Sequence, residues 1–534
     1  MYRFFETIPG ILAWATIALM VLFSWRLPTA VAIFIILFDI YWLFKTVYLS
    51  FHLRATFSKM RQNLKINWLE KLHVSGFKFQ DIYHLVILPM YQEPFEIVKE
   101  SFETLANTNY PKEKFIVVLA TEERALRQSS GQADYDTLET AQKIKQVYGN
   151  KFFKFLITNH PINIDKEIPG KGSNQTWAAK QAKKLIIDVL KIPYENILIS
   201  VFDVDTQVLP DYFSRLTYVF LTCQHPQHSS FQPIPLFTNN IFQTPALARV
   251  VSFSSSFWHM MQQSRPERQT TFSSHSMPFK AIVEIGFWST DIVSEDSRIF
   301  WQCYLHYNGN WRVEPLLYPV SMDANVAPTF WQTMVNQYKQ QRRWGWGCEN
   351  IAYFLSGFMS RRKVGIPTPD ASAPTDGRRA DYGVGFRTSG KNSVSDGKKI
   401  PLRKKLYWAF TVIESFHSWA TNALLIFALG WLPLALGGQS FKLTLLSYNL
   451  PQITRIIMTL AMVGITTSAI LSIILLPPKP YWFKKRHYLI YFFQWILMPI
   501  TLIIFGALPG LEAQTRLMLG NRFRLGFWVT PKHR

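Results

Sequence analysis

Two aspartates separated by one residue follow an apolar run in the first half of the chain. Residues 196–202 are mostly β-forming and lead directly into Asp203-Val204-Asp205. Strands of an open α/β sheet end in the ligand crevice, so we expect both carboxylates to lie there. Neighbouring carboxylates repel each other unless a cation neutralises them, and Mg²⁺ or Mn²⁺ shared with diphosphate oxygens does so. The pair predicts a divalent-metal site; the alternative is two solvated turn aspartates.

A second acidic pair, Glu295-Asp296, follows Ser294. A carboxylate beside another acid in a crevice is a candidate general base, because burial and like charge raise its proton affinity. The alternative is structural: Ser294 or Asp296 could cap a helix that begins near Arg298.

Arginine and tryptophan lie side by side in residues 340–347, which read QQRRWGWG. An indole face suits a pyranose ring, and a guanidinium suits phosphate oxygens. The segment therefore favours sugar-phosphate recognition, although the same residue types also collect at membrane interfaces.

A short glycine-containing loop surrounds Lys171 and opens a predicted helix. Gly170 and Gly172 would let backbone amides approach an anion, and the helix N-terminus and Lys171 favour negative charge. The alternative is an ordinary loop with two glycines.

Composition and charge indicate a membrane protein. Of the 534 residues 48% are hydrophobic and only 17% are charged, against about 25% charged in ordinary globular chains. This composition excludes disordered, collagen-like and coiled-coil chains. The net charge of +22 suits anionic lipid headgroups or phosphorylated substrates in such a chain, and nucleic acid is not an expected partner.

Apolar stretches mark both ends of the chain as membrane segments. Residues 8–25 and 28–50 predict a helical hairpin, and the basic residues after it predict a cytoplasmic flank. Further stretches lie at 406–437, 452–476 and 489–508, the last interrupted by Pro499. Three crossings would leave the basic C-terminus outside. We therefore expect an even number, with one stretch interfacial or broken at Pro499, or another crossing hidden in 406–450.

The region between these ends has the pattern of a soluble α/β domain. Predicted strands at 83–89, 114–120, 152–157 and 196–202 alternate with helices at 93–107, 135–148 and 172–190. Such alternation predicts parallel βαβ units and a Rossmann-like cytosolic domain.

In this order the motifs resemble those of the membrane-integrated family 2 glycosyltransferases, in particular the processive synthases of cellulose, chitin, hyaluronan and mannan. Residues 86–94 (VILPMYQEP) resemble the opening strand and its P-x-Y-x-E turn, and Lys171 to Asn174 resembles the G-K neighbourhood. Residues 203–205 resemble the metal-binding D-x-D, and residues 294–296 the T/S-E-D motif. Residues 340–344 resemble Q-x-x-R-W, and residues 527–532 (FWVTPK) the F-x-V-T-x-K gating loop.

This resemblance implies a fold, an activity and a set of site residues. The fold would be an α/β GT-A (Rossmann-like) cytosolic domain with a multi-pass α-helical membrane domain. The activity would be inverting transfer of a hexose-type sugar from a nucleotide-diphosphate donor to a growing polysaccharide, coupled to export. Asp296 would be the base, and Asp203 and Asp205 would bind Mg²⁺ or Mn²⁺. Nucleotide-diphosphate contacts would come from Pro89, Tyr91, Glu93, Glu122, Lys171, Asp203, Gln340, Arg343, Thr530 and Lys532, and acceptor contacts from Glu295, Asp296 and Trp344.

One motif departs from the family pattern. The family's second strand usually ends in an Asp-Asp pair that contacts the nucleobase, whereas here Glu122-Glu123 follows residues 115–121. Either glutamate could substitute, so the nucleobase stays open. Two alternative functions also stay open: transfer of one sugar to a polyprenyl phosphate or other lipid, and a non-catalytic membrane transporter or scaffold.

The resemblance and the apolar pattern together divide the chain into seven segments. They predict a multi-pass protein with a cytoplasmic catalytic domain, of a bacterial inner membrane, in contact with lipids and compatible with an accessory subunit. The segments are an N-terminal transmembrane hairpin (1–52), a basic interfacial linker (53–82), the GT-A domain (83–338), an interfacial helix with Q-x-x-R-W (339–358), a basic flexible loop (359–405), C-terminal transmembrane helices (406–510) and an amphipathic segment with the gating-type tail (511–534).

Overall fold

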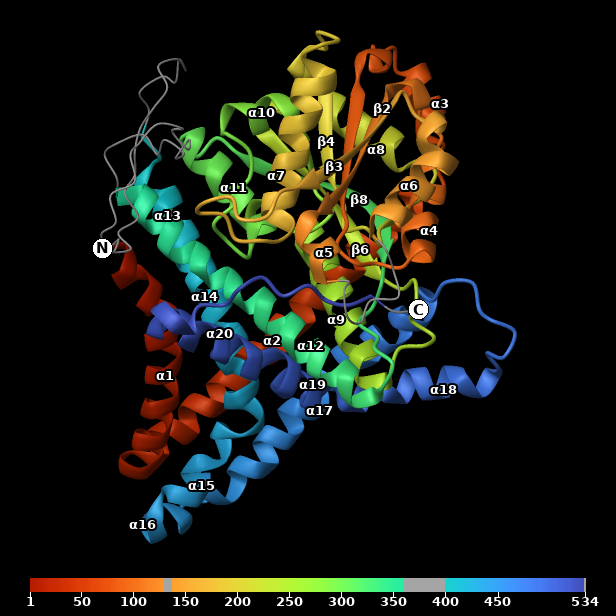
Figure 1. Cartoon of the computed structure of the whole chain (residues 1–534). Helices are drawn as coiled ribbons and strands as arrows, with labels where there is room; N and C mark the ends of the chain where they lie inside the picture. The colour runs from red at the N-terminus through yellow and green to blue at the C-terminus, as the bar shows by residue number, and fades with distance from the viewer. Residues whose placement is uncertain (129–136, 360–398, 533–534) are drawn as a thin grey trace.

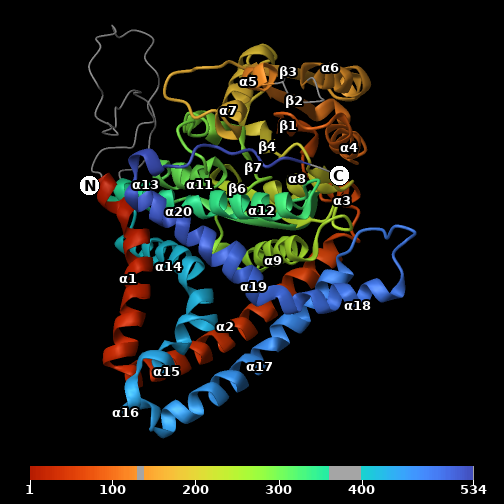
Figure 2. The same cartoon turned by 60° about the horizontal axis from the view of Figure 1, so that its bottom comes forward.

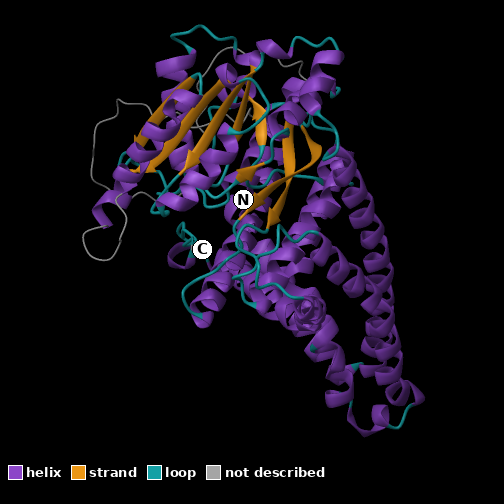
Figure 3. Cartoon of the chain, turned by 90° about the vertical axis from the view of Figure 1, so that its right-hand side faces the viewer, coloured by secondary structure: helices purple, strands orange, loops and turns teal. Residues whose placement is uncertain are grey.

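A sheet-containing domain stands on a group of long helices (Figure 1). The computed structural model describes residues 1–128, 137–359 and 399–532. The predicted basic loop at 359–405 therefore lies almost entirely outside the described residues. Strands and their covering helices occupy one end of the molecule, and helices alone occupy the other (Figure 3).

Four parallel strands form one half of an eight-stranded sheet. They run in the order β3 (Lys154–His160), β2 (Phe115–Glu122), β1 (Tyr83–Pro89) and β4 (Ile197–Val201). All four overlap the strands that the sequence predicts. Helices α4 (Phe95–Ala106), α6 (Thr137–Tyr148) and α7 (Lys171–Ala182) connect them.

Both faces of β1, β2 and β4 are covered, which explains their largely apolar sequences. Leu85 and Ile87 of β1 belong to the core beneath α7. Val86 and Leu88 belong to the opposite core, which includes α4 and α8 (Tyr212–Thr222). Because parallel strands end at one edge, the residues that follow β1, β2 and β4 gather there.

The other half of the sheet is mixed rather than parallel, unlike the simple βαβ pattern expected from the sequence. Strand β7 (Ser276–Pro278) is antiparallel to β4 and to β6 (Ser229–Phe237), β6 is parallel to β8 (Arg312–Met322), and β5 (Gln207–Val208) is antiparallel to β8. Because β7 runs against β4, the residues before β7 lie at the carboxyl end of β4. The amide of Val201 donates to the carbonyl of His275 at 3.2 Å.

Among the residues that the structure describes, four helices are long and apolar enough to cross a membrane, or up to five if a bent pair counts as one span. They are α1 (Tyr2–Arg26), α2 (Pro28–Asn63), α17 (Leu445–Ile474) and the segment Lys485–Leu519. The bent pair joins α14 (Leu402–Phe427) to Leu429–Leu436, which includes α15 (Leu432–Leu436), at an angle of 46°. Helices α1, α2, α14, α15 and α17 extend away from the sheet domain (Figures 1 and 2).

The segment Lys485–Leu519 takes a different course. It is divided into α18 (Lys485–Phe493), α19 (Met498–Leu502) and α20 (Leu508–Leu519), with a 3₁₀ turn before α19 and a π-helical turn after it. Pro499 and Pro509 stand near the starts of α19 and α20, where a missing N–H costs least. The three helices lie across the base of the sheet domain (Figure 2).

Further helices join the sheet domain to this base. The carboxylate of Glu512 on α20 accepts hydrogen bonds from Tyr338 Oη at 2.9 Å and Arg342 Nη1 at 2.7 Å, which ties α20 to α12 (Phe330–Gly345). The remaining helices are α3 (Trp68–Val74), α5 (Glu123–Gln128), α9 (Ala246–Gln263), α10 (Phe279–Glu284), α11 (Glu295–His306), α13 (Glu349–Met359) and α16 (Gly438–Lys442). After α20 the chain turns back and crosses the sheet domain as an extended tail, residues 520–532 (Figures 1 and 2).

Candidate active site

The two aspartates after β4 lie at the carboxyl edge of the sheet. Asp203 Oδ1 is 2.7 Å from Lys171 Nζ, and Asp203 Oδ2 accepts a hydrogen bond from Ser273 Oγ at 2.8 Å. Burial by itself raises the pKa of Asp203, but the positive charges of Lys171 and Lys532 outweigh it and hold the pKa well below its usual range. Asp203 is therefore a carboxylate rather than a neutral acid.

Asp205 is completely buried. Its Oδ2 accepts a hydrogen bond from the amide of Asp323 at 2.9 Å and another from Lys532 Nζ at 2.7 Å. Its Oδ1 is buried and has no hydrogen-bond partner within the described part of the chain. A buried, unsatisfied carboxylate oxygen is costly unless a cation or a donor group reaches it. The alternative of two solvated turn aspartates thus does not describe Asp205.

Lys171 joins the first acidic pair to the second. Its Nζ lies 2.7 Å from Asp203 Oδ1 and 2.9 Å from Asp296 Oδ2. Burial lowers the pKa of Lys171, but the charges of Asp203 and Asp296 reverse this effect and raise it. One ammonium ion at the start of α7 therefore holds two carboxylates that are far apart in the sequence.

The second acidic pair stands at the N-terminus of α11. Glu295 is buried, and burial together with the charge of Asp296 raises the pKa of Glu295 to about 8. Glu295 therefore holds a proton at neutral pH, beside a partly exposed Asp296. Ser294 occupies the helix-cap position but makes no side-chain cap bond; its hydroxyl donates to Glu349 Oε1 at 2.8 Å instead. The simple capping interpretation is not supported for Ser294.

The C-terminal tail reaches the same edge of the sheet. Burial lowers the pKa of Lys532, but its contacts with the charges of Asp205 and Asp323 raise it overall. Thr530 is buried, and its hydroxyl has no partner among the described residues. A Cβ on Gly170 would lie only 2.5 Å from the ring of Phe527. Glycine at position 170 is thus what allows the tail to approach the loop before α7.

The end of β1 carries three further predicted residues. Pro89 is the last residue of β1, and the carboxylate of Glu93 accepts a hydrogen bond from the amide of Tyr91 at 2.7 Å. Burial raises the pKa of Glu93 to about 7, while the nearby charge of Lys532 opposes this effect. Of the three residues, Glu93 thus lies close enough to the tail for the charge of Lys532 to act on it.

The two glutamates at the end of β2 have different partners. Glu122, the last residue of β2, is buried and ion-paired with Arg124, whose guanidinium lies 4.6 Å from the ring centroid of Tyr91. Glu123 Oε2 instead accepts a hydrogen bond from the amide of Ile162 at 3.1 Å. Glu122 therefore shares an arginine neighbour with Tyr91 at the predicted nucleobase position, whereas Glu123 binds the following loop.

The Q-x-x-R-W residues lie along α12. The guanidinium of Arg343 is 5.3 Å from the ring centroid of Phe527 in the tail. Gln340 Oε1 accepts a hydrogen bond from Gln337 Nε2 at 3.2 Å. The ring of Trp344 packs against that of Phe237 at the end of β6, with 6.1 Å between centroids. Arg343 thus lies at the tail, and Trp344 lies beside the mixed half of the sheet.

Asp323 and Asn239, like Ser273 beside Asp203, are side chains of the site that sequence reasoning missed. Asp323 follows β8, and burial together with the charge of Asp205 raises the pKa of Asp323 to about 8. Asn239 Nδ2 donates to Asp205 O and to Asp323 Oδ1, each at 3.0 Å. The pairings of β8 with β5 and with β6 bring these residues to Asp205, so no local spacing could have indicated them.

The donor set suits a hard divalent cation. No group of three or more His, Cys, Asp and Glu side chains within the described ranges is arranged to hold a metal. Asp203 and Asp205 nevertheless offer two carboxylates, and Asp205 Oδ1 is an orphaned buried oxygen. Mg²⁺ and similar cations typically bind one or two carboxylates and complete their coordination with substrate phosphates and water. The residues present therefore fit a cation that arrives with a diphosphate.

The sequence profile described as "Glycosyl transferase family group 2" matches residues 198–508. The match spans more than half of the chain, and the chain belongs to this family. The protein is accordingly a glycosyltransferase that uses nucleotide-sugar donors. The predicted fold class, a GT-A-like α/β domain joined to apolar helices that could span a membrane, is confirmed.

Two solved structures align with parts of this chain at low sequence identity. The mannosyltransferase PcManGT from Pyrobaculum calidifontis, in complex with GDP-Man and Mn²⁺, is 11% identical with a TM-score of 0.39, over 78% of this chain and 98% of that chain. S. aureus TarS 1-349, in complex with UDP-GlcNAc, is 14% identical with a TM-score of 0.30, over 52% of this chain and 73% of that chain. No curated protein matches the sequence. The family assignment rests on the profile match.

Proposed function

We propose that the protein transfers a hexose-type sugar, with inversion, from a nucleotide-diphosphate donor to a polysaccharide that grows at the membrane and is exported. The contact that carries this proposal is the bridge made by Lys171, whose Nζ is 2.7 Å from Asp203 Oδ1 and 2.9 Å from Asp296 Oδ2. It supports the roles of a donor-binding acid and a base in one cleft, because the reacting groups of both substrates must meet there.

The donor half of the site is formed by acids and cations together. A divalent cation held by Asp203 and Asp205 would stabilise the negative charge that develops on the leaving diphosphate. Lys171 and Arg343 would offset the remaining phosphate charge. Glu122 and Tyr91 would contact the nucleobase side of the donor, and the buried turn at Glu93 would support them.

The acceptor half rests on Asp296. Its carboxylate would take the proton from an acceptor hydroxyl as that oxygen attacks the anomeric carbon, while the bond to the diphosphate breaks on the opposite face. This geometry inverts the anomeric configuration. Glu295, protonated at neutral pH because burial and Asp296 raise its pKa to about 8, would remain a hydrogen-bond donor toward the acceptor. Trp344 would stack against an acceptor sugar.

The tail would act as a gate over the donor. In the described conformation Lys532 Nζ donates a hydrogen bond to Asp205 Oδ2. The tail and a divalent cation would therefore compete for the same carboxylate. Donor entry would displace Lys532, and tail closure afterwards would place Thr530 and Lys532 on the diphosphate. A closed tail excludes water and limits hydrolysis of the donor.

We infer four membrane crossings, by α1, α2, the bent pair that starts with α14, and α17. These helices extend away from the sheet domain, whereas α18–α20 lie across its base (Figure 2), which supports α18–α20 as interfacial helices. The number of C-terminal crossings would then be two, with the tail on the same side as the catalytic domain. That side would be the cytoplasm, of a bacterial inner membrane.

Labelling from either side of the membrane tests this arrangement. We expect a cysteine introduced by Lys442→Cys, on α16, to react with an impermeant maleimide added outside intact cells. A cysteine introduced by Gly526→Cys, in the tail, should react only after the membrane is opened. Labelling of position 526 in intact cells would contradict both the crossing number and the gate.

A donor screen tests the proposed reaction. The purified protein with Mg²⁺ or Mn²⁺ should release nucleoside diphosphate from one nucleotide sugar and convert that sugar into long chains, seen on gels and by linkage analysis. A product one sugar longer than a lipid acceptor would favour the polyprenyl-phosphate alternative. Absence of diphosphate release from every donor and acceptor combination would refute the enzymatic function and favour the transporter or scaffold.

A further inference from the structure

A basic and aromatic surface lies outside the catalytic cleft, on the loop between α17 and α18 and on the first turn of α18. Both views show this region projecting sideways beyond the rest of the molecule (Figures 1 and 2). We call it the basic platform and define it by its four cationic side chains, all exposed: Lys479, Lys484, Lys485 and Arg486. None of the four forms an ion pair with another residue that the structure describes.

The surrounding sequence leaves this charge without a local acidic counterpart. From residue 415 to residue 511 the chain contains no Asp or Glu. Cationic side chains without acidic partners attract anions, and the attraction falls with distance over about one Debye length. The platform is therefore a local source of positive potential rather than part of a neutral ion-pair network.

Exposed apolar side chains continue directly from the platform. Leu489, Ile490, Phe493 and Ile496 are exposed, and their spacing places them along one side of α18 and the turn that follows. Tyr481 in the preceding loop is 98% exposed. Cations followed by aromatic and aliphatic side chains along one helix are typical of a helix that lies in the membrane interface.

The other side of α18 and its following turn is fixed to the sheet domain. Arg249 Nε on α9 donates to Gln494 Oε1 at 2.7 Å, and the ring of Trp495 stacks on that of Phe257 with 5.8 Å between centroids. The exposed stripe therefore cannot turn inward to bury itself. It stays available on the outside of the molecule, at the level where α17 ends.

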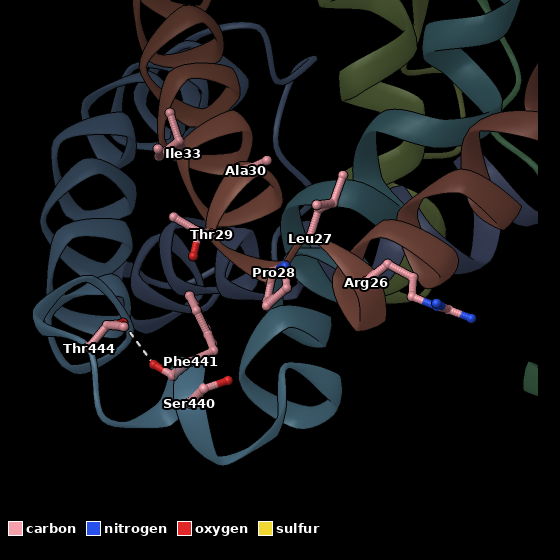
Figure 4. A pocket seen from close by; sticks show the side chains of 9 residues that line it. All are labelled: Arg26, Leu27, Pro28, Thr29, Ala30, Ile33, Ser440, Phe441 and Thr444. Carbon is pink, nitrogen blue, oxygen red and sulfur yellow. Dashed lines mark hydrogen bonds between the residues drawn. The ribbon is translucent and has the colours of Figure 1, made fainter.

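The opposite end of the long helices differs in chemistry. A pocket there lies at the turn between α1 and α2, where Thr29, Ser440 and Thr444 supply hydroxyl groups and Arg26 points away from them (Figure 4). Nearby α16 ends at Lys442. The two cations at this end are separated, whereas four are gathered on the platform within eight residues.

We propose that the basic platform binds the phosphate headgroups of anionic phospholipids in the leaflet next to the catalytic domain. The four cations would lie at headgroup depth, and the exposed stripe of α18 would enter the acyl region below them. Each Lys or Arg near an anionic leaflet adds to the attraction, so a cluster of four selects an anionic lipid over a zwitterionic one. This proposal requires that α17 crosses the membrane, as inferred above. It does not require that the protein transfers sugar.

The test compares two lipids on the intact protein. Full-length protein in mixed micelles is given spin-labelled phosphatidylglycerol or phosphatidylcholine, and the motionally restricted fraction of each lipid is measured. We expect wild-type protein to restrict phosphatidylglycerol at least about threefold more strongly, with the preference reduced in high salt. The fourfold variant Lys479→Gln, Lys484→Gln, Lys485→Gln, Arg486→Gln should bring the ratio close to one.

A control with the same change in charge separates the platform from net charge. Lys143, Lys145, Lys151 and Lys154 are exposed on the sheet domain, and their replacement by Gln should leave the lipid preference unchanged. Single Lys485→Gln should give an intermediate ratio, which keeps the test valid if the fourfold variant does not fold. Equal restriction of both lipids by wild-type protein would overturn the proposal and leave a soluble polyanion as the occupant. The control variant would also overturn the proposal if it lost the lipid preference as fully as the fourfold platform variant does.

Discussion

Replacement of Asp296 by Asn should lower sugar transfer by about three to four orders of magnitude while donor affinity changes little. General-base catalysis typically contributes about 10² to 10⁴ in rate, and the amide cannot accept the proton of the acceptor hydroxyl. The amide keeps the shape of the side chain, and Lys171 keeps its 2.7 Å contact with Asp203, so the donor half of the site stays intact. Diphosphate release measures turnover, and binding of the nucleoside diphosphate measures donor affinity.

Two neighbouring acids serve as comparisons for this variant. Asp291 is exposed on the loop before α11, and Asp291→Asn removes the same charge five positions away, with little expected effect. Glu295 holds a proton at neutral pH because burial and Asp296 raise its pKa to about 8. Glu295→Gln should therefore lower turnover much less than Asp296→Asn does at pH 6.5. Turnover retained in Asp296→Asn, or an equal loss in Asp291→Asn, would remove Asp296 from the role of base.

Strands β1, β2 and β4 were predictable because they are buried on both faces. Residues 115–119 are apolar without a break, and the corresponding strand is entirely buried, so composition alone marks it. Strands β5 and β7 contain two and three residues, which are too few to show the alternation of apolar and polar residues that predicts a strand. Strands β6 and β8 contain Pro233, Pro235, Pro315 and Pro319, which reduce the strand signal.

The same contrast holds for the site. Asp203 and Asp205 follow a recognisable strand, so their place at the sheet edge could be argued from local pattern. The position of Asp323 could not be predicted in this way, because its approach to Asp205 depends on the antiparallel and parallel pairings of the mixed half-sheet. The tail was indicated only by its resemblance to a gating motif, and its contact through Lys532 joins residues 327 positions apart.

Replacement of Asp205 by Asn should lower turnover by about 10³-fold and weaken divalent-cation binding in the presence of a nucleoside diphosphate. Loss of one preorganised charge at the leaving group typically lowers turnover by a factor of about this size. Asp205 is fully buried and is the partner of Lys532 Nζ at 2.7 Å, so the amide removes a negative charge that both Lys532 and a cation use. A chelator should likewise abolish wild-type turnover, and added Mn²⁺ should restore it.

The decisive comparison for Asp205 is its neighbour Asp323, measured by binding rather than by activity. Burial and the charge of Asp205 raise the pKa of Asp323 to about 8, so Asp323 is neutral at pH 7 and Asp323→Asn changes no charge there. Electron paramagnetic resonance of free Mn²⁺ should show weaker binding by Asp205→Asn and nearly wild-type binding by Asp323→Asn. Above pH 8 wild-type Asp323 ionises, and the two carboxylates should then bind Mn²⁺ more tightly than the Asp323→Asn variant does. Wild-type Mn²⁺ affinity in Asp205→Asn would mean that the cation is held elsewhere, because a buried carboxylate that binds it cannot be neutralised without loss.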